Sequence, residues 1–180
     1  NATTASASAT GLHELVWTAC GNTWRVLENN MATLPDTDLL AYLEGLGPED
    51  MIKWAYDTYG KRAALQTSLQ NTGCVQIDMA AQVAPDLRII TVDTWRLPDE
   101  TYQLIHDIET KYGIIIERFE PDPKRVKQMV DRHGEFLFFD NKDKQEYCCS
   151  IRKVEPNNRA METVDVVLGG RRRDQSNFRK

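Results

Sequence analysis

Apolar positions recur every three or four residues over the first part of the chain, residues 12–59. This spacing predicts helices in the segments LHELVWTACGNTWRVLENNM, DTDLLAYLEGL and PEDMIKWAYDTYG. Gly47-Pro48 separates the last two segments, and Gly60 follows the third at a position typical of a helix end. We therefore expect a helical N-terminal part.

From Lys61 onward, short apolar runs alternate with helical patterns. The runs RAALQTS, DLRIITVDT, IIIERFE and VDVVLGG are typical of strands, whereas CVQIDMAAQV, PDETYQLIHDIETKYG, PKRVKQMVDRHG and VEPNNRAMET are typical of helices. This alternation predicts an α/β fold, with a parallel sheet that carries helices on both faces. A chain of 180 residues is usually one domain, so we expect residues 12–180 to form a single domain.

Composition places this domain in the ordinary globular class. Hydrophobic residues make up 41% and charged residues 27% of the chain, and no apolar run approaches the roughly 20 residues that a membrane span needs. Residues 1–11 are rich in Ala, Ser and Thr, as in a disordered or trimmed leader. Four cysteines, two of them adjacent, favour a reducing compartment. We expect a cytoplasmic protein, with an organellar stroma as the alternative if residues 1–11 are the remnant of a targeting sequence.

Charge is distributed unevenly along the chain. The last ten residues, RRRDQSNFRK, carry five basic residues and one acidic residue, so they sum to +4 while the preceding residues sum to −9 against a total of −5. Broad nucleic-acid binding usually needs a basic face across a domain. One basic cluster on an acidic chain instead predicts a small anionic ligand and argues against a nucleic-acid partner.

Three segments follow predicted strands, where ligands bind in open parallel sheets. In QTSLQNTG, the helix N-terminus with Thr67, Ser68 and Asn71 could hold an anion, although ordinary helix capping is the favoured alternative. In VDTWRL, Asp93 and Thr94 could bind a sugar hydroxyl or a base and Arg96 an anion, or the segment is an ordinary turn. In GGRRRDQSNFRK, the arginines could bind a phosphate or a sulfate. The alternative is a solvated basic tail.

Cys148 and Cys149 are adjacent, in QEYCCSIRKVEP. A disulfide between them is disfavoured, because neighbouring Cα atoms are about 3.8 Å apart and disulfides prefer about 4.4–6.8 Å. Zinc sites favour cysteines spaced by two to four residues. An iron–sulfur cluster is one interpretation that stays open, because its several irons can bind neighbouring thiolates. Two packed thiols and a redox-sensing pair are the other two.

In this order and spacing, the motifs resemble those of the assimilatory adenylyl-sulfate and phosphoadenylyl-sulfate reductases. VDTWRLPDETY is similar to the family's LDTGRLxPETY, CCSIRKVEPNNRA to CCxxRKVxPLxRAL, and GGRRRDQSNFR to GLRRDQSxxR. The resemblance runs from about Pro48 to Lys180. It implies a Rossmann-like fold of the adenine nucleotide alpha hydrolase type, with helices before the sheet.

The resemblance also implies an activity, in which adenylyl sulfate is converted to sulfite and AMP through an S-sulfocysteine. The thiol donor would be thioredoxin or a glutathione/glutaredoxin-type reductant. The cysteine pair marks the branch that carries a [4Fe–4S] cluster. Two of the four cluster ligands would be Cys148 and Cys149. The catalytic side chains implied are Lys153, Arg172 and Arg173. The substrate-binding residues implied are Thr67, Ser68, Asn71, Asp93, Thr94, Arg96, Gln175, Ser176 and Arg179.

The sequence departs from the family pattern in four respects. The family's nucleophile and its other two cluster cysteines follow the arginine segment, and the chain ends at Lys180 before either, with Cys20 and Cys74 as poor substitutes. Trp95 stands where the family usually has Gly, and Leu69-Gln70 where another family Gly is usual. The alternatives are therefore a non-catalytic nucleotide-binding or interaction module, or a reductase specific for the 3′-phosphorylated nucleotide. A related ATP-pyrophosphatase is disfavoured because its SGGxD loop is absent. The sequence leaves open whether the chain forms a homo-oligomer.

Overall fold

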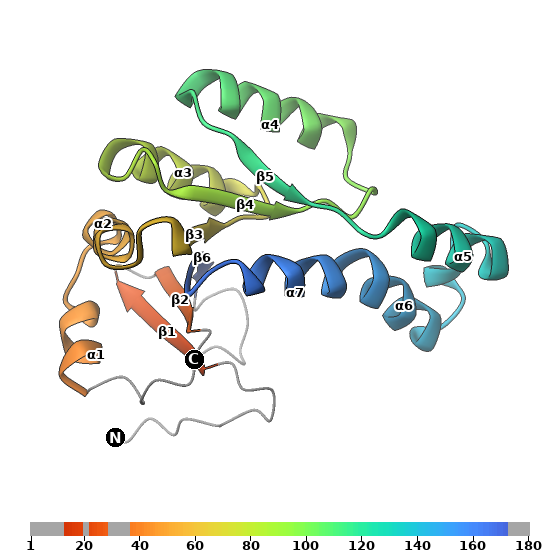
Figure 1. The fold of residues 1–180 in the computed structure, drawn as a ribbon, viewed down its shortest axis with the longest axis horizontal. Helices are drawn as coiled ribbons and strands as arrows, with labels where there is room; N and C mark the ends of the chain where they lie inside the picture. The colour runs from red at the N-terminus through yellow and green to blue at the C-terminus, as the bar shows by residue number, and fades with distance from the viewer. Residues whose placement is uncertain (1–12, 20–21, 29–36, 173–180) are drawn as a thin grey trace. The chain divides into compact units, whose positions relative to one another are not determined.

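The structure is a computed structural model that describes residues 13–19, 22–28 and 37–172. Its chain divides into two compact units, residues 1–88 with 164–180, and residues 89–163. In the ribbon drawing of Figure 1 the elements are coloured along the chain. In the part of the chain that the structure describes, no helix is both long and apolar enough to cross a bilayer.

The first unit combines an antiparallel hairpin with a parallel strand pair. Its strands are β1 (His13–Ala19), β2 (Asn22–Glu28), β3 (Ala63–Gln66) and β6 (Val166–Arg172). The strands β1 and β2 pair antiparallel, and β2 pairs antiparallel with β6. The pair β3 and β6 is parallel, with Gln66 opposite Gly169. The carboxyl ends of β3 and β6 are therefore neighbours.

The expectation of a helix over LHELVWTACGNTWRVLENNM is wrong, because β1 and β2 occupy that segment. In register, Trp17 lies opposite Trp24 and Ala19 opposite Asn22. Apolar residues also alternate with a period of two here, and β-branched and aromatic residues are frequent, both of which favour strands. The sequence of this segment fits both a helical and a strand spacing, and the structure adopts the strands.

Helices of the first unit follow the expected segments. They are α1 (Thr37–Glu44), α2 (Pro48–Tyr59), the short η1 (Gly60–Arg62) and α3 (Asn71–Val83). Pro48 opens α2 and Gly60 ends it with a φ of 54°, as the sequence predicts. Buried residues of β3 and β6 pack with those of α2, including Ile52, Leu65 and Leu168. An ion pair between Arg62 and Asp165, 2.5 Å from Nε to Oδ2, joins the starts of β3 and β6.

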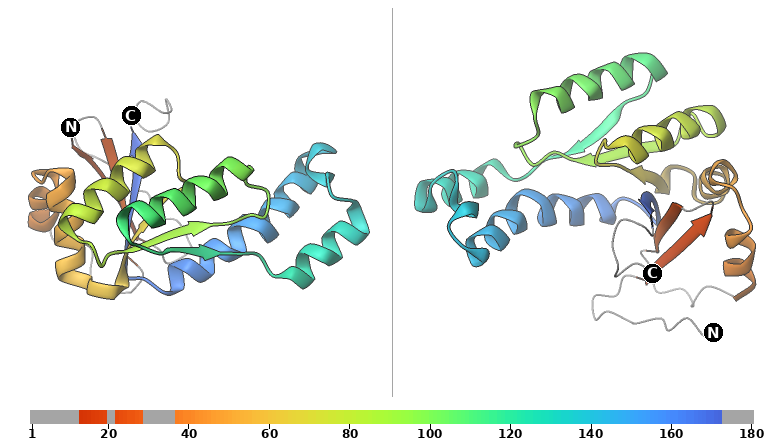
Figure 2. Two further views of the ribbon diagram at one scale, coloured as in Figure 1. Left: turned by 90° about the horizontal axis from the view of Figure 1, so that it is seen from above. Right: turned by 180° about the vertical axis from the view of Figure 1, so that it is seen from behind.

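The second unit contains the parallel pair β4 (Arg88–Val92) and β5 (Ile116–Phe119), in which Ile89 lies opposite Ile116. Between them, α4 (Asp99–Tyr112) ends at Gly113, which has a left-handed φ of 66°. This helix covers one face of the strand pair in each view (Figures 1 and 2). Ile105 and Ile108 are its buried residues.

The rest of the second unit is helical. It comprises α5 (Pro123–His133), η2 (Leu137–Phe139), α6 (Lys142–Cys149), the π-helical turn η3 (Ser150–Val154) and α7 (Glu155–Glu162). Figure 1 shows α6, η3 and α7 as one continuous helical run. Parallel strands joined by helices in both units confirm the predicted α/β class.

Candidate functional site

The loop after β3 is folded by its own threonine. Thr67 is buried, and its Oγ1 accepts a hydrogen bond of 2.9 Å from the Leu69 N–H. This bond turns the chain through Leu69, whose φ of 59° lies in the left-handed region. A non-glycine residue there costs about 1–2 kcal/mol. The position is one where the resembling family usually has glycine, so the structure gives that preference a physical reason.

The loop leads directly into α3. Gln70 is its N-cap residue but contributes no side-chain hydrogen bond, and the first turn of α3 holds no acidic residue. Ser68 and Asn71 are exposed beside this turn. Free N–H groups at a helix N-terminus attract anions. This geometry is compatible with the predicted binding of an anion by Thr67, Ser68 and Asn71. The Thr67 hydroxyl oxygen also accepts the hydrogen bond that folds the turn.

The carboxyl end of β6 lies next to this loop, since Gly169 pairs in register with Gln66. Arg172 is the last residue of β6, and the structure describes its backbone only. The remaining predicted residues of the arginine segment, Arg173, Gln175, Ser176 and Arg179, lie outside the described residues. Their binding and catalytic roles stay predictions.

In the second unit, Asp93 organises the loop after β4. Its side chain is 2% exposed, and its Oδ1 accepts hydrogen bonds from the Trp95 N–H at 2.8 Å and the Tyr102 hydroxyl at 2.9 Å. The Asp93 N–H donates to the Phe119 carbonyl at 3.0 Å. Asp93 therefore holds the loop to α4 and to the end of β5. Its predicted contact with a sugar or base would have to be made in addition to these bonds.

Burial and the hydrogen bond to Asp93 raise the pKa of Tyr102 to about 12, against an ordinary value of about 10. The folded state thus keeps a proton that the unfolded state loses above about pH 10. The stability that this proton contributes is present below about pH 10 and is lost as the pH rises through about 12. We expect the Tyr102→Phe variant to lose less unfolding free energy between these pH values than the unaltered chain. Urea unfolding at several pH values measures it.

A Tyr42→Phe variant is the control for this titration, since Tyr42 is exposed. It should lose stability with rising pH as the unaltered chain does. Equal losses in the Tyr102→Phe variant and the unaltered chain would contradict the assignment.

Trp95 and Arg96 complete the same loop. Trp95 has a φ of 57° and is 38% exposed, at the second position where the resembling family usually has glycine. The Arg96 Nη2 donates to the Glu135 carbonyl at 2.5 Å, and its guanidinium lies 4.8 Å from the centre of the Phe138 ring. Arg96 is therefore held by protein groups, and its predicted contact with an anion stays a prediction.

Arg152 connects this loop to the cysteine pair. Its side chain is buried, and its Nη1 donates to the Thr94 carbonyl at 3.0 Å. Arg152 lies in the π-helical turn that directly follows Cys149, and such turns are frequent at functional sites. The sequence pattern does not reveal this link, because folding brings the Thr94 carbonyl to Arg152. Lys153, the predicted catalytic cation, is exposed and forms no ion pair within the described ranges.

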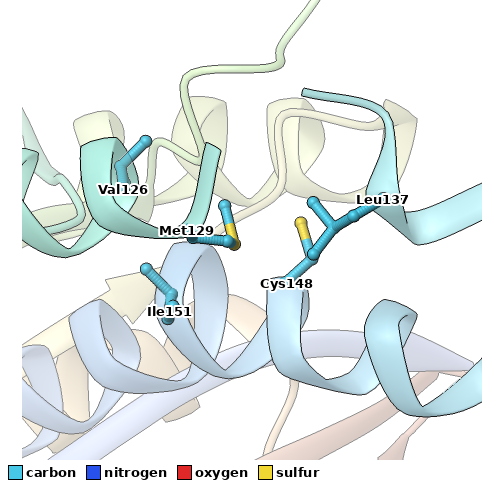
Figure 3. Packing of buried hydrophobic residues seen from close by; sticks show 5 residues of the cluster. All are labelled: Val126, Met129, Leu137, Cys148 and Ile151. Carbon is cyan, nitrogen blue, oxygen red and sulfur yellow. The ribbon is translucent and has the colours of Figure 1, made fainter. Parts of the chain in front are cut away.

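The two cysteines face different surroundings. Cys148 is buried with Val126, Met129, Leu137 and Ile151, in a cluster drawn from α5, η2 and the helical run (Figure 3). The sulfur atoms of Cys148 and Met129 both point into this cluster in the close-up. Cys149 is exposed. The two thiols therefore differ in access to solvent although they are neighbours in sequence.

This difference predicts unequal effects of two serine substitutions. Cys148→Ser places a hydroxyl among apolar side chains and should lower the unfolding free energy by about 1–2 kcal/mol. Cys149→Ser should leave stability within about 0.5 kcal/mol but remove one fast-reacting thiol in the metal-free chain. Urea unfolding and titration with a chromogenic disulfide measure the two effects. A fast thiol that persists in Cys149→Ser and disappears in Cys148→Ser would reverse the assignment.

The donors at Cys148 and Cys149 bear on whether an iron–sulfur cluster fits here. Two thiols on one helical run are soft ligands of the kind that such clusters take. Among the residues described here, no group of three or more His, Cys, Asp or Glu side chains is arranged to hold a metal ion. Cys148 and Cys149 are thus the right ligand type for half of a four-thiolate site, whereas their thiols lie in different surroundings, one among apolar side chains and one exposed.

A separate pocket of about 510 Å³ lies beyond the carboxyl ends of β4 and β5. Its lining residues are Trp95, Arg118, Glu120, Pro121, Asp122, Pro123, Glu155 and Arg159. Within it, the Arg159 Nε donates to Glu155 at 2.7 Å and its Nη2 to the Glu120 carbonyl. These bonds hold α7 to the segment after β5, so two of the charged groups around the pocket are paired with each other.

Comparison with known proteins identifies relatives of this arrangement. An adenosine 5′-phosphosulfate reductase of Pseudomonas aeruginosa is 34% identical over 138 residues, which are 77% of this chain and 51% of the relative. Adenosine 5′-phosphosulfate reductase 2 of Bacillus subtilis is 32% identical over 160 residues, 88% of this chain and 62% of the relative. The chain therefore spans about half to two thirds of the length of these relatives.

A solved structure supports the fold. The phosphoadenylyl-sulfate reductase of Candida auris, in a phosphate complex, matches with a TM-score of 0.61 and 24% identity, over 74% of this chain and 65% of that one. The family model of the phosphoadenosine phosphosulfate reductase domain matches residues 62–180, which include the loops after β3 and β4 and the cysteine pair. The chain therefore belongs to the phosphoadenosine phosphosulfate reductase family.

Proposed function

We propose that this chain provides the nucleotide-binding part and two cluster ligands of an enzyme that reduces adenylyl sulfate to sulfite and AMP. Family membership and the names of the relatives support the reaction. The observation that carries the proposal is the hydrogen bond from Arg152 to the Thr94 carbonyl. It ties the segment that follows Cys148 and Cys149 to one of the loops proposed to bind the nucleotide.

In the proposed reaction, a cysteine thiolate that is not assigned in this chain attacks the sulfur of adenylyl sulfate. The bond between that sulfur and the bridging phosphate oxygen breaks, AMP leaves with the electron pair, and an S-sulfocysteine forms. A thiol of the thioredoxin or glutathione type then attacks the cysteine sulfur and releases sulfite. The two thiols end as a disulfide, so they supply the two electrons that the sulfur gains.

The side chains of this chain would bind and neutralise the substrate. The first turn of α3 with Thr67, Ser68 and Asn71 would face the sulfate or phosphate oxygens. Asp93, Thr94 and Arg96 are the other proposed substrate-binding residues. Arg172, Arg173 and Arg179 would lower the repulsion between the anionic substrate and the incoming thiolate, with Gln175 and Ser176 as polar contacts.

Cys148 and Cys149 would hold two irons of a [4Fe–4S] cluster. When bound, the cluster would supply a charged inorganic centre close to the substrate, and Lys153 would balance charge between the two. The exposure of Lys153 and its lack of an ion pair among described residues leave its ammonium available for that role.

Two measurements on the anaerobically purified enzyme that contains this chain test the proposal. Iron and acid-labile sulfide should be present, and sulfite should form from adenylyl sulfate with reduced thioredoxin. The absence of both iron and sulfite would overturn it. Offering the 3′-phosphorylated nucleotide in a parallel assay distinguishes the alternative specificity, because a preference for that nucleotide would place the protein in the other branch.

A second candidate is a nucleotide-binding module without turnover. This candidate expects binding of AMP or adenylyl sulfate without sulfite release. Sulfite production by the 180-residue chain itself would exclude it.

A further inference from the structure

Gln76 is a buried polar side chain that the proposed reaction does not use. It lies on α3 and is 1% exposed, and neither its Nε2 nor its Oε1 has a hydrogen-bond partner among the described residues. A buried carboxamide is normally paired, since each unpaired group loses its bonds to water without replacement. A methionine or leucine of similar volume would fill this space without that cost. The unpaired amide therefore leaves a donor and an acceptor for a partner other than the described residues.

The amide lies at the end of the sheet where ligands bind. It faces Gly170 of β6, so closely that a Cβ there would be 2.6 Å from Gln76 Oε1 and 3.0 Å from Nε2. The preceding residue, Gly169, has open space where a side chain would stand. Gly169 is the last parallel partner of β3, opposite Gln66, and Gly170 follows it on the edge reached by the loop into α3. No side chain of Gly169 or Gly170 blocks a ligand at this edge.

The two unpaired atoms define the chemistry of the partner. Nε2 is a donor and Oε1 is an acceptor, so the partner must offer an acceptor and a donor side by side. Sulfate and phosphate oxygens accept only, and would leave Oε1 facing a negative charge. The 6-amino group of adenine with its neighbouring ring nitrogen presents the required pair, and glutamine binds that edge through both atoms.

We propose that Gln76 binds the amino edge of the adenine ring and makes this site selective for 6-aminopurine nucleotides. The inference rests on the proposed function, because it takes the ligand to be an adenine nucleotide. It adds a base-reading residue from the first unit, separate from the residues that hold the sulfate or phosphate.

The test compares two nucleotides that differ in one group. Dissociation constants of AMP and purine riboside 5′-monophosphate, which lacks the 6-amino group, are measured by calorimetry for the unaltered chain and the Gln76→Met variant. We expect the unaltered chain to bind AMP about tenfold more tightly, a ratio that corresponds to the free energy of one buried hydrogen bond. In Gln76→Met the preference should fall below about threefold, while inhibition of AMP binding by inorganic sulfate stays unchanged.

Gln82→Met is the matched control, since Gln82 is an exposed glutamine on the same helix. It should keep the full preference for AMP. An undiminished preference in Gln76→Met would overturn the assignment and leave the proposed function standing, whereas no AMP binding by the unaltered chain would overturn both.

Thermal unfolding separates a binding role from a structural one. Removal of two unpaired polar atoms should leave the midpoint of Gln76→Met equal to or above that of the unaltered chain. A second variant, Gln76→Leu, should behave in the same way. Loss of the folding transition in both variants would mean that the amide has a structural partner, and would overturn the inference.

Discussion

Replacing Gly73 with alanine is expected to lower the free energy of unfolding by about 1–3 kcal/mol, although alanine is the better helix former. The new Cβ would lie 2.0 Å from Thr67 Oγ1 and 3.2 Å from its Cβ. Thr67 is buried and its hydroxyl holds the Leu69 N–H, so it has little room to move. Alanine gains about 1 kcal/mol over glycine in a helix. Overpacking at about 1–3 kcal/mol and the lost bond at about 0.5–1.5 kcal/mol outweigh that gain.

Urea unfolding of four variants checks this account. Gly169→Ala is the matched control, because nothing lies within 4 Å of a Cβ at that glycine, and it should change stability by less than about 0.5 kcal/mol. A Thr67→Ala background lacks the Oγ1 that makes the 2.0 Å contact and keeps only the Cβ at 3.2 Å, so Gly73→Ala should be near neutral or stabilising there. Equal costs of Gly73→Ala in the two backgrounds would contradict the clash as the cause.

Sequence patterns predicted the strands and most helices from Pro48 onward because local signals and tertiary packing agree there, whereas α6 was not predicted. The proline at the start of α2 and Gly60 at its end are local signals with a direct backbone meaning. The β-branched run of β4 is buried, as a parallel strand should be. In the segment of β1 and β2, two periodicities overlap, and only pairing with β6 selects the strand. Pairing with a distant segment cannot be derived from spacing.

Some features of the candidate site can likewise be predicted from local sequence, whereas others depend on contacts with distant residues. Motif order located the loops after β3 and β4, and their left-handed residues Leu69 and Trp95 occupy the positions where the resembling family favours glycine. The partners of Asp93 and Arg96 could not be read from sequence, since Tyr102 and Glu135 reach them through folding. Gln76 was missed for the same reason. A glutamine in an amphipathic helix carries no sign of its burial.

Substituting Arg152 with alanine is expected to have the other large effect, a loss of about 2–4 kcal/mol in unfolding free energy. The buried side chain leaves a cavity, and the Thr94 carbonyl loses its donor. Relief of the desolvated charge offsets part of this loss. Lys153→Ala is the neighbouring control and should cost less than about 0.5 kcal/mol, because Lys153 is exposed. Urea unfolding measures both, and similar values for the two variants would contradict a linking role for Arg152.

An Arg152→Met variant separates packing from the hydrogen bond, since methionine fills much of the space of the arginine stem but donates nothing. We expect it to recover more than half of the stability that Arg152→Ala loses. Amide exchange of residues 93–96 should nevertheless stay as fast as in Arg152→Ala, because the Thr94 carbonyl is still without its donor. Slow exchange in Arg152→Met would mean that the stem alone holds the loop. The hydrogen bond would then not be what couples the cysteine-bearing helical run to the loop after β4.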